Sequence, residues 1–330
     1  MNVRGYASRA AIGALGVALW LGAAQAQDNY PDRPIRIVIG LAAGGPIDSL
    51  GRSLAEPFSA ALGQKMVIEN VVGAGGSIAH AQVARADPDG YTLLLTHVAM
   101  ATAGSLNKNL SYDPQKSFIP IGLVTDFPTI LVARPGLPVK DSAEALQYLR
   151  ANSDKISFGH AGIGSTTHLC ALLVMESLGL KFNLIPYKGA GPALVDLLAD
   201  RVDFMCDGPT PATKDNVATG RVKAVATLKK DRLNTLPNVP TSYELGLKDL
   251  ELNNPQIVYV PAGTPEPIVA KLVAGLRTAL KDQNLLRRFD DLGCIAASEE
   301  AISPKAAADR LASEIKLWEP ILRKNVEQQK

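Results

Sequence analysis

Residues 34–48 read PIRIVIGLAAGGPID, and this stretch sets the pattern for the rest of the chain. Within it, residues 35–39 are mostly β-branched and alternate isoleucine with arginine and valine, which predicts a strand. Gly44 and Gly45 allow a sharp turn, and Pro46 suits the first turn of a helix because its missing N–H has no intrahelical partner there. Apolar residues then recur at spacings of three and four, which predicts a helix. The free amides at such a helix start attract anions, although most strand-to-helix turns bind nothing.

The same alternation of strand, glycine turn and helix continues along the chain and predicts doubly wound parallel sheets. Further strands are predicted at 65–69, 91–96, 155–159, 182–187, 202–206 and 221–227. Further helices are predicted at 142–152, 169–178, 193–199, 268–280 and 306–326. The long extended segment 119–134 is suited to cross between two lobes, and 221–227 is expected to return to the first one. We therefore expect an α/β fold of two lobes joined by two crossings, with residues 27–125 and 227–330 in one lobe and 126–226 in the other.

The first residues have the features of an export signal. Arg4 and Arg9 precede the apolar segment 11–24, which is too short to span a bilayer, and Ala24-Gln25-Ala26 has the small residues of a cleavage site. Cleavage after Ala26 predicts a periplasmic protein whose mature chain starts at Gln27, with no later apolar run long enough for a membrane helix.

Export also changes the charge balance. The signal holds two of the 34 basic residues and none of the 32 acidic ones, so 32 basic residues face 32 acidic ones in the mature chain. A chain without excess positive charge has no general field for nucleic acid or for acidic membranes. Any anion site must therefore be local.

The three cysteines, Cys170, Cys206 and Cys294, lie far apart and match neither a CxxC nor a zinc-ligand spacing. An exported protein is permitted a disulfide, but the odd number and long spacings favour three buried thiols. If one bridge forms, we favour Cys170 with Cys206.

Catalytic patterns are absent from the sequence: it contains no GxSxG, no HExxH and no SxxK followed by a KTG-type triad. The side chains that remain for acid–base or metal chemistry are His80, His97, His160, His168, Asp48 and Asp207. All four histidines are more simply explained as groups that cap a turn or hydrogen-bond a ligand, and the two aspartates as caps. We therefore predict no catalytic residue, no metal ligand and no cofactor.

Several helix starts are instead expected to face one cleft. The turn 160–168, HAGIGSTTH, repeats the opening pattern, and Ser165 is a good N-cap that leaves the next amides available to a ligand. Opposed amide groups bind a small carboxylate by dipoles and hydrogen bonds without any arginine. An exported, neutral, two-lobed α/β protein with such a cleft is best interpreted as a solute-binding protein.

The mature chain also resembles a known family, the substrate-binding proteins of tripartite tricarboxylate transporters, TctC-like receptors also called the Bug family. The resemblance runs through a series of short motifs in order: Tyr30-Pro31, Gly44-Gly45 with Asp48 and Arg52, Glu69-Asn70 with 73–76, 88–93, Gly162 with 164–165 and 168–169, 186–189, 236–241 with Glu244 and Gly246, 261–265, and Trp318. It implies the type II periplasmic binding protein fold, in which two lobes close on a carboxylate. It also implies delivery of the ligand to a membrane permease, or signalling through a sensor. A monomer is the default for this fold, and the charge balance already argues against nucleic acid as a partner.

By resemblance, the ligand carboxylates lie between the turns that match residues 43–48 and 161–168, with further contacts from the ends of other strands. The predicted ligand-binding residues are Ala43, Gly44, Gly45, Ile47, Asp48, Thr96, His97, Ala161, Gly162, Gly164, Ser165, Thr166, His168 and Asp207. Two departures prevent the ligand from being copied from other members. His160 stands where the family commonly has serine, and 253–256, NNPQ, replaces a common tryptophan.

Two other functions stay open from the sequence. An exported hydrolase or lyase would use Asp48, His97 or His168 on a carboxylate in the same cleft. A receptor for a nonacidic solute would use His97, His160 and the polar segment 253–254. The ligand itself is expected to be a di- or tricarboxylate, an amino acid or an aromatic acid.

Overall fold

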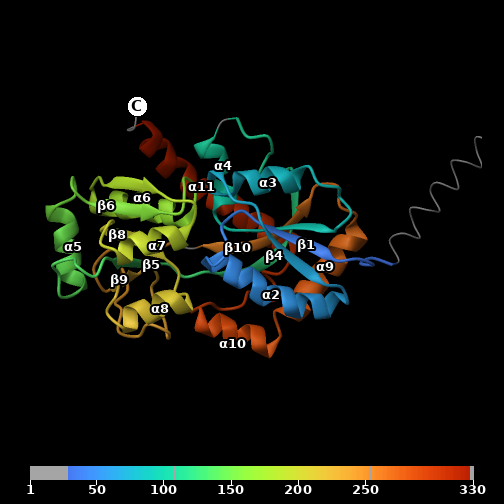
Figure 1. Ribbon diagram of the computed structural model, residues 1–330. Coiled ribbons are helices and arrows are strands. Elements are labelled where there is room, and N and C mark those ends of the chain that lie inside the picture. Colours follow the sequence, from blue (N-terminus) through green and yellow to red (C-terminus); the bar gives the residue numbers. More distant parts are fainter. Residues whose placement is uncertain (1–28, 108, 253, 328–330) are drawn as a thin grey trace, which may run out of the picture.

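The computed structural model describes residues 29–107, 109–252 and 254–327, so the predicted signal peptide and its cleavage site lie outside the described residues. The described chain forms two α/β lobes, each built on a five-stranded sheet (Figure 1). Among these residues, no helix combines the length and apolar character needed to cross a membrane.

The first sheet has the strand order β2-β1-β3-β10-β4. Its strands are β1 (Ile35–Ile39), β2 (Met66–Asn70), β3 (Thr92–Thr96), β4 (Phe118–Asp126) and β10 (Pro255–Pro261). β1 is parallel to both β2 and β3, whereas β10 runs antiparallel to β3 and β4. The sheet is therefore mixed rather than wholly parallel, because the chain returns from the second lobe to insert β10.

The second sheet repeats this topology with the order β7-β6-β8-β5-β9. Its strands are β5 (Ile130–Ala133), β6 (Ser157–His160), β7 (Asn183–Pro186), β8 (Phe204–Asp207) and β9 (Lys223–Thr227). β6 is parallel to β7 and β8, and the inserted antiparallel strand is β5, which arrives from the first lobe. β9 pairs with β5, so the expectation that 221–227 returns to the first lobe is wrong, and the return begins after Thr227.

Helices cover both faces of each sheet. In the first lobe, α2 (Pro46–Leu62), α9 (Glu266–Ala279) and α10 (Gln283–Asp291) cover one face, and α3 (Ser77–Ala84) and α4 (Ala99–Leu106) cover the other. In the second lobe, α5 (Ser142–Ala151) and α6 (Thr166–Leu178) oppose α7 (Ala190–Leu198), and α8 (Pro211–Ala218) follows β8. The short helix η1 (Ala74–Gly76) belongs to the first lobe, where it precedes α3. The alternation in β1 explains the layers, since Ile37 and Ile39 enter one core and Val38 the opposite one.

The last helix, α11 (Pro304–Glu327), is shared between the lobes. Leu311 packs in the core of the first lobe, whereas Trp318 and Leu322 are buried in the core of the second. The amphipathic period alone led to the expectation that this helix completes the first lobe, but it is long enough to reach across both (Figure 1). Arg310 joins it to the crossing between β4 and β5, with a bidentate ion pair to Asp126 at 2.7 and 3.2 Å.

Cys170 and Cys206 form a disulfide, so the expectation of three free thiols is wrong for this pair and holds for the buried Cys294. The reason is tertiary: the first turns of α6 lie against β8, and the two Cα atoms are 6.3 Å apart, within the range that a disulfide spans.

Candidate functional site

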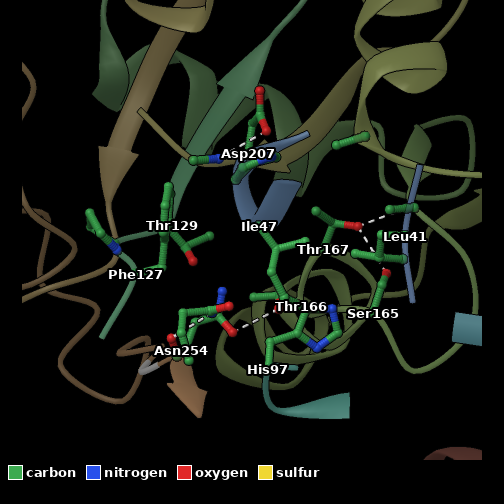
Figure 2. Close-up of a pocket in the computed structure, with 16 residues that line it drawn as sticks. Leu41, Ile47, His97, Phe127, Thr129, Ser165, Thr166, Thr167, Asp207 and Asn254 are labelled. Atoms are coloured by element: carbon green, nitrogen blue, oxygen red, sulfur yellow. Dashed lines mark hydrogen bonds between the residues drawn. The ribbon is translucent and has the colours of Figure 1, made fainter. Parts of the chain in front are cut away.

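A cleft between the lobes gathers residues from separate helix starts and strand ends (Figure 2). Its volume is about 50 Å³. The first lobe, the crossing 127–129 and the second lobe all contribute; the lining residues are Leu41, Pro46, Ile47, His97, Phe127, Pro128, Thr129, Ala161, Ser165, Thr166, Thr167, Ala190, Asp207, Gly208, Asn254 and Gln256.

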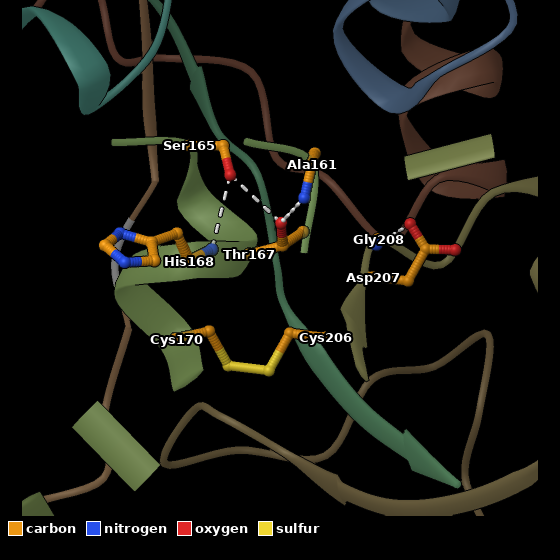
Figure 3. Close-up of a disulfide and its surroundings, with 8 residues drawn as sticks. All are labelled: Ala161, Ser165, Thr167, His168, Cys170, Cys206, Asp207 and Gly208. Atoms are coloured by element: carbon orange, nitrogen blue, oxygen red, sulfur yellow. Dashed lines mark hydrogen bonds between the residues drawn. A yellow bond between two sulfur atoms is a disulfide. The ribbon is translucent and has the colours of Figure 1, made fainter. Parts of the chain in front are cut away.

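The start of α6 supplies the polar wall of this cleft. Ser165 is the N-cap, and its hydroxyl accepts the N–H of His168 at 3.3 Å while donating to the Gly162 carbonyl at 2.7 Å. The Thr167 hydroxyl accepts the N–H of Ala161 at 2.7 Å (Figure 3). The N–H groups of Thr166 and Thr167 have no carbonyl one turn back, so the fold presents them as donors without a helical partner.

The start of α2 supplies a more apolar wall. Gly45 is the N-cap and offers no side-chain bond, and Pro46 brings no N–H. Asp48 is buried, but it turns to its own loop: its carboxylate accepts the Gly44 N–H at 2.9 Å, Arg52 Nε at 2.9 Å and an N–H of Asn70 at 3.0 Å. Although burial opposes ionisation, these donors and the charge of Arg52 hold the pKa of Asp48 below its ordinary value.

His97 lines the cleft as a neutral donor. Its Nδ1 accepts the N–H of Ala99 at 3.0 Å, so the ring proton belongs on Nε2. Burial lowers the pKa of His97 to about 4. Thr96, the preceding residue, is bonded instead to His80, with 2.8 Å between its hydroxyl oxygen and Nε2, and lies outside the lining.

His160 ends β6 and His168 lies in the first turn of α6, and their ring centroids are 4.8 Å apart. Through Nδ1, His160 accepts the N–H of Gly162 and His168 accepts the N–H of Gly164, each at 3.3 Å. Burial lowers the pKa of both imidazoles, that of His168 to about 4. Both rings therefore stabilise the turn as neutral hydrogen-bond acceptors.

Asp207 ends β8 and is the acidic side chain of the lining. One carboxyl oxygen accepts the hydroxyl of Thr213 at 2.6 Å and the other accepts the N–H of Gly208 at 2.9 Å. Burial raises the pKa of Asp207 to about 6, because these two neutral donors only partly replace water. The carboxyl thus ties the end of β8 to the start of α8.

The cleft contains neither lysine nor arginine in its lining. Within 29–107, 109–252 and 254–327, no group of three His, Cys, Asp or Glu side chains is placed to hold a metal ion. The arrangement is suited to binding a small anion through backbone and hydroxyl donors, and no side chain is paired there as nucleophile and base.

The structure brings together six of the fourteen residues predicted for the site: Ile47, His97, Ala161, Ser165, Thr166 and Asp207 line the cleft. The others, Ala43, Gly44, Gly45, Asp48, Thr96, Gly162, Gly164 and His168, lie in or next to the turns and shape them. Sequence reasoning predicted the crossing but assigned it no ligand contact, and it named Asn254 only for a nonacidic ligand. In the structure 127–129 line the cleft, and Asn254 and Gln256 face it at the start of β10. The only local signal at β10 was the loss of a family tryptophan.

Comparison with known protein families identifies the family of this chain. The family model described as "Tripartite tricarboxylate transporter family receptor" matches residues 50–324. The chain belongs to this family. The resemblance inferred from the sequence motifs is thereby confirmed.

Solved structures of other receptors have the same fold. "Structure of periplasmic binding protein BugD" is 43% identical with a TM-score of 0.85, over 89% of this chain and 98% of that one. MatC (Rpa3494) from Rhodopseudomonas palustris with bound malate is 36% identical with a TM-score of 0.84, over 89% and 100% of the two chains. R. palustris Rpa4515 with adipate is 29% identical with a TM-score of 0.82, over 89% and 97%. The two-lobed α/β fold of a periplasmic binding protein is thus confirmed.

Proposed function

We propose that the chain is a receptor that captures a small carboxylate in the cleft between its lobes. The observation that carries this proposal is a lining that includes the starts of α2, α6 and α7 and contains neither lysine nor arginine. Helix starts offer unpaired N–H groups and a positive dipole end, which favour an anion. Relatives with bound malate and adipate, reported above, support a carboxylate as the ligand.

Contacts between the lobes support capture by closure. The hydroxyl of Thr166 on α6 donates to Asn254 Oδ1 at 3.0 Å, at the beginning of β10. Across the mouth, a Cβ at Gly189 would lie 3.3 Å from that of Ala42. We infer that the lobes, 27–125 with 227–330 and 126–226, rotate about the crossings near Thr125 and Thr227 to open and close.

We further infer that the receptor works outside the cytoplasm, in the periplasm, as a monomer without cofactor and without turnover of its ligand. The closed form would deliver the ligand to a permease of the tripartite tricarboxylate type, or signal through a sensor. Recovery of the bound acid unchanged by mass spectrometry tests the absence of turnover, and a converted product would favour an enzyme.

Thermal unfolding of the chain from Gln27 onward tests the binding itself. A panel of small carboxylates is compared with the corresponding amides. A ligand present at about one hundred times its Kd stabilises the folded state by about 2.7 kcal/mol. We expect a shift with an acid and none with its amide; no shift with any acid, in protein free of retained ligand, would refute the proposal.

A matched pair of substitutions on α7 locates the site. Ala190 is the first residue of α7 and lines the cleft, whereas Val195 on the same helix is 61% exposed. Ala190→Asp places a carboxylate where the ligand's would lie, in a helix position that tolerates acidic side chains, so it should abolish binding without loss of stability. Val195→Asp should leave binding unchanged, and equal effects of the two would place the ligand elsewhere.

A further inference from the structure

A second, larger cavity lies beside the cleft and shares two lining residues with it. Its volume is about 480 Å³, against about 50 Å³ for the cleft. Leu41 and Ala161 line both cavities, so they form the boundary between them. The whole lining of this outer chamber is Gly40, Leu41, Val72, Gly73, Ala74, Gly75, Ala161, Gly162, Ile163, Pro186, Tyr187 and Lys188.

The two volumes imply different contents. A water molecule needs roughly 10–15 Å³ measured in this way, so the cleft holds only a few heavy atoms, the size of a carboxylate head group. Binding sites for whole small molecules usually measure about 300–1,000 Å³, a range that includes the outer chamber. A ligand held by its head group in the cleft therefore has room for its chain in the neighbouring chamber.

The walls of the chamber suit a chain with a polar end. Leu41, Val72, Ile163 and Pro186 supply apolar surface from both lobes. Tyr187 is already engaged, because its hydroxyl donates to Asp196 at 2.7 Å.

Lys188 is the basic side chain of the chamber. It is exposed and makes no hydrogen bond or ion pair with any described residue, so its ammonium group is available. It stands two residues before Ala190, which lines the cleft, so one short segment leads from the chamber to the head-group site.

We propose that the outer chamber is a second subsite, which takes the carbon chain and the distal carboxylate of an elongated dicarboxylate, with Lys188 beside that second charge. This inference rests on the proposed function, since it assumes that the first carboxylate is held in the cleft. The amides of the cleft then recognise one end of the ligand, and a mobile point charge recognises the other.

Calorimetric titration with adipate and with hexanoate, which has the same chain length and one carboxylate, tests the proposal. The variant is Lys188→Glu, and Lys181→Glu is its control, because Lys181 is also exposed but lines neither cavity. We expect Lys188→Glu to weaken the binding of adipate by about tenfold, because it reverses one partly exposed charge, and to leave the affinity for hexanoate unchanged. Lys181→Glu should change neither affinity.

A second variant tests the space without the charge. Val72 is 46% exposed, so Val72→Trp adds bulk to the chamber at little risk to the core. It should weaken the binding of adipate and of hexanoate at least tenfold. The affinity for acetate should stay the same, because acetate fits within the cleft. The subsite is refuted if Lys188→Glu changes the affinities for adipate and hexanoate equally or changes neither. It is also refuted if Val72→Trp leaves the affinities for the two long acids unchanged. In either case the proposed receptor function is not contradicted. If no acid binds the unmodified protein, the proposed function fails instead.

Discussion

The helix starts of α2 and α6 follow the same sequence pattern, but they hold their turns from opposite sides. Before α2, Asp48 on the helix accepts the N–H of Gly44 in the loop and pairs with Arg52 on the same helix, and the cleft is lined there by Pro46 and Ile47. Before α6, the hydroxyls that fix the turn belong to residues that line the cleft itself. We infer from this difference that, in the proposed receptor, the second lobe would provide most donors to the ligand and the first lobe would close over it.

The largest expected difference between the lobes concerns stability. The disulfide joins α6 to β8 over a sequence separation of 36 residues, beside Ser165 and Asp207 (Figure 3), and the described part of the first lobe has no counterpart. In the chain-entropy model a loop of this length is worth about 4 kcal/mol. Replacing both cysteines by serine should lower the unfolding free energy by about this amount. The fluorescence of Trp318 reports it, because this residue is buried in the core of the second lobe and is the only tryptophan after the signal segment.

Cys294 provides the control in the first lobe. It is buried and unpaired, so Cys294→Ser should cost only about 1 kcal/mol. Equal losses for the single and the double variant would mean that the disulfide does not set the stability of the second lobe.

The next difference concerns pH. The pKa of Asp207 rises from its ordinary 3.8 to about 6 through burial, so between these values the folded state keeps a proton that the unfolded state has lost. Stability therefore falls as pH rises through this interval of 2.2 pH units, by up to about 3 kcal/mol. Asp207→Asn removes this dependence. The unfolding free energy of the variant minus that of the unmodified protein, measured by urea unfolding, should therefore increase by that amount from pH 3.5 to 7.

The buried histidines of the first lobe have the opposite sign. Burial lowers the pKa of His80 to about 3 and that of His97 to about 4, so both histidines stay neutral in the folded state. The folded protein therefore loses stability as pH falls below 6.5, the ordinary pKa of histidine. This background is common to both proteins and cancels in the comparison with Asp207→Asn. A difference in unfolding free energy that stays constant with pH would show that the pKa of Asp207 is the same in the folded and the unfolded state.

A third prediction concerns closure. Gly75 in the first lobe has a φ of +62°, and a Cβ there would lie 2.0 Å from the carbonyl oxygen of Ile163 in the second lobe. Gly75→Ala should therefore hold the lobes apart and weaken ligand binding by about tenfold or more, since only a fraction of molecules can close. Gly63→Ala has the same positive-φ strain, at +73°, but a Cβ there meets nothing within 4 Å. Solution scattering should show an opened shape for the first variant alone, and equal affinities would contradict the role of this contact.

The sequence predicted the parts of this comparison that depend on local patterns. Strands, glycine turns and the Ser165 cap follow from periodicity and from the chemistry of helix starts. β10 was not predicted, although the centre of 255–261, IVYV, is a strand-forming run with a proline at each end of the strand. The disulfide, and the choice of core for each half of α11, depend on which elements meet in space, which no local pattern encodes. The position of Asn254 at the cleft likewise depends on which elements meet in space.

The smallest effects are expected from single substitutions at the two helix N-caps, Ser165 and Gly45. Ser165→Ala removes a side-chain cap and should cost about 1 kcal/mol of stability, together with some affinity because the Thr167 hydroxyl loses its neighbour. Gly45→Ser adds a hydroxyl where the backbone is extended, φ −80° and ψ 172°, and where a Cβ meets only the Ala42 carbonyl oxygen at 3.6 Å. It should raise stability by a few tenths of a kcal/mol, because serine caps a helix slightly better than glycine. If the donors of the second lobe dominate binding, calorimetry will show a loss of affinity for Ser165→Ala and almost none for Gly45→Ser; the reverse order would mean that the start of α2 is the principal anion site.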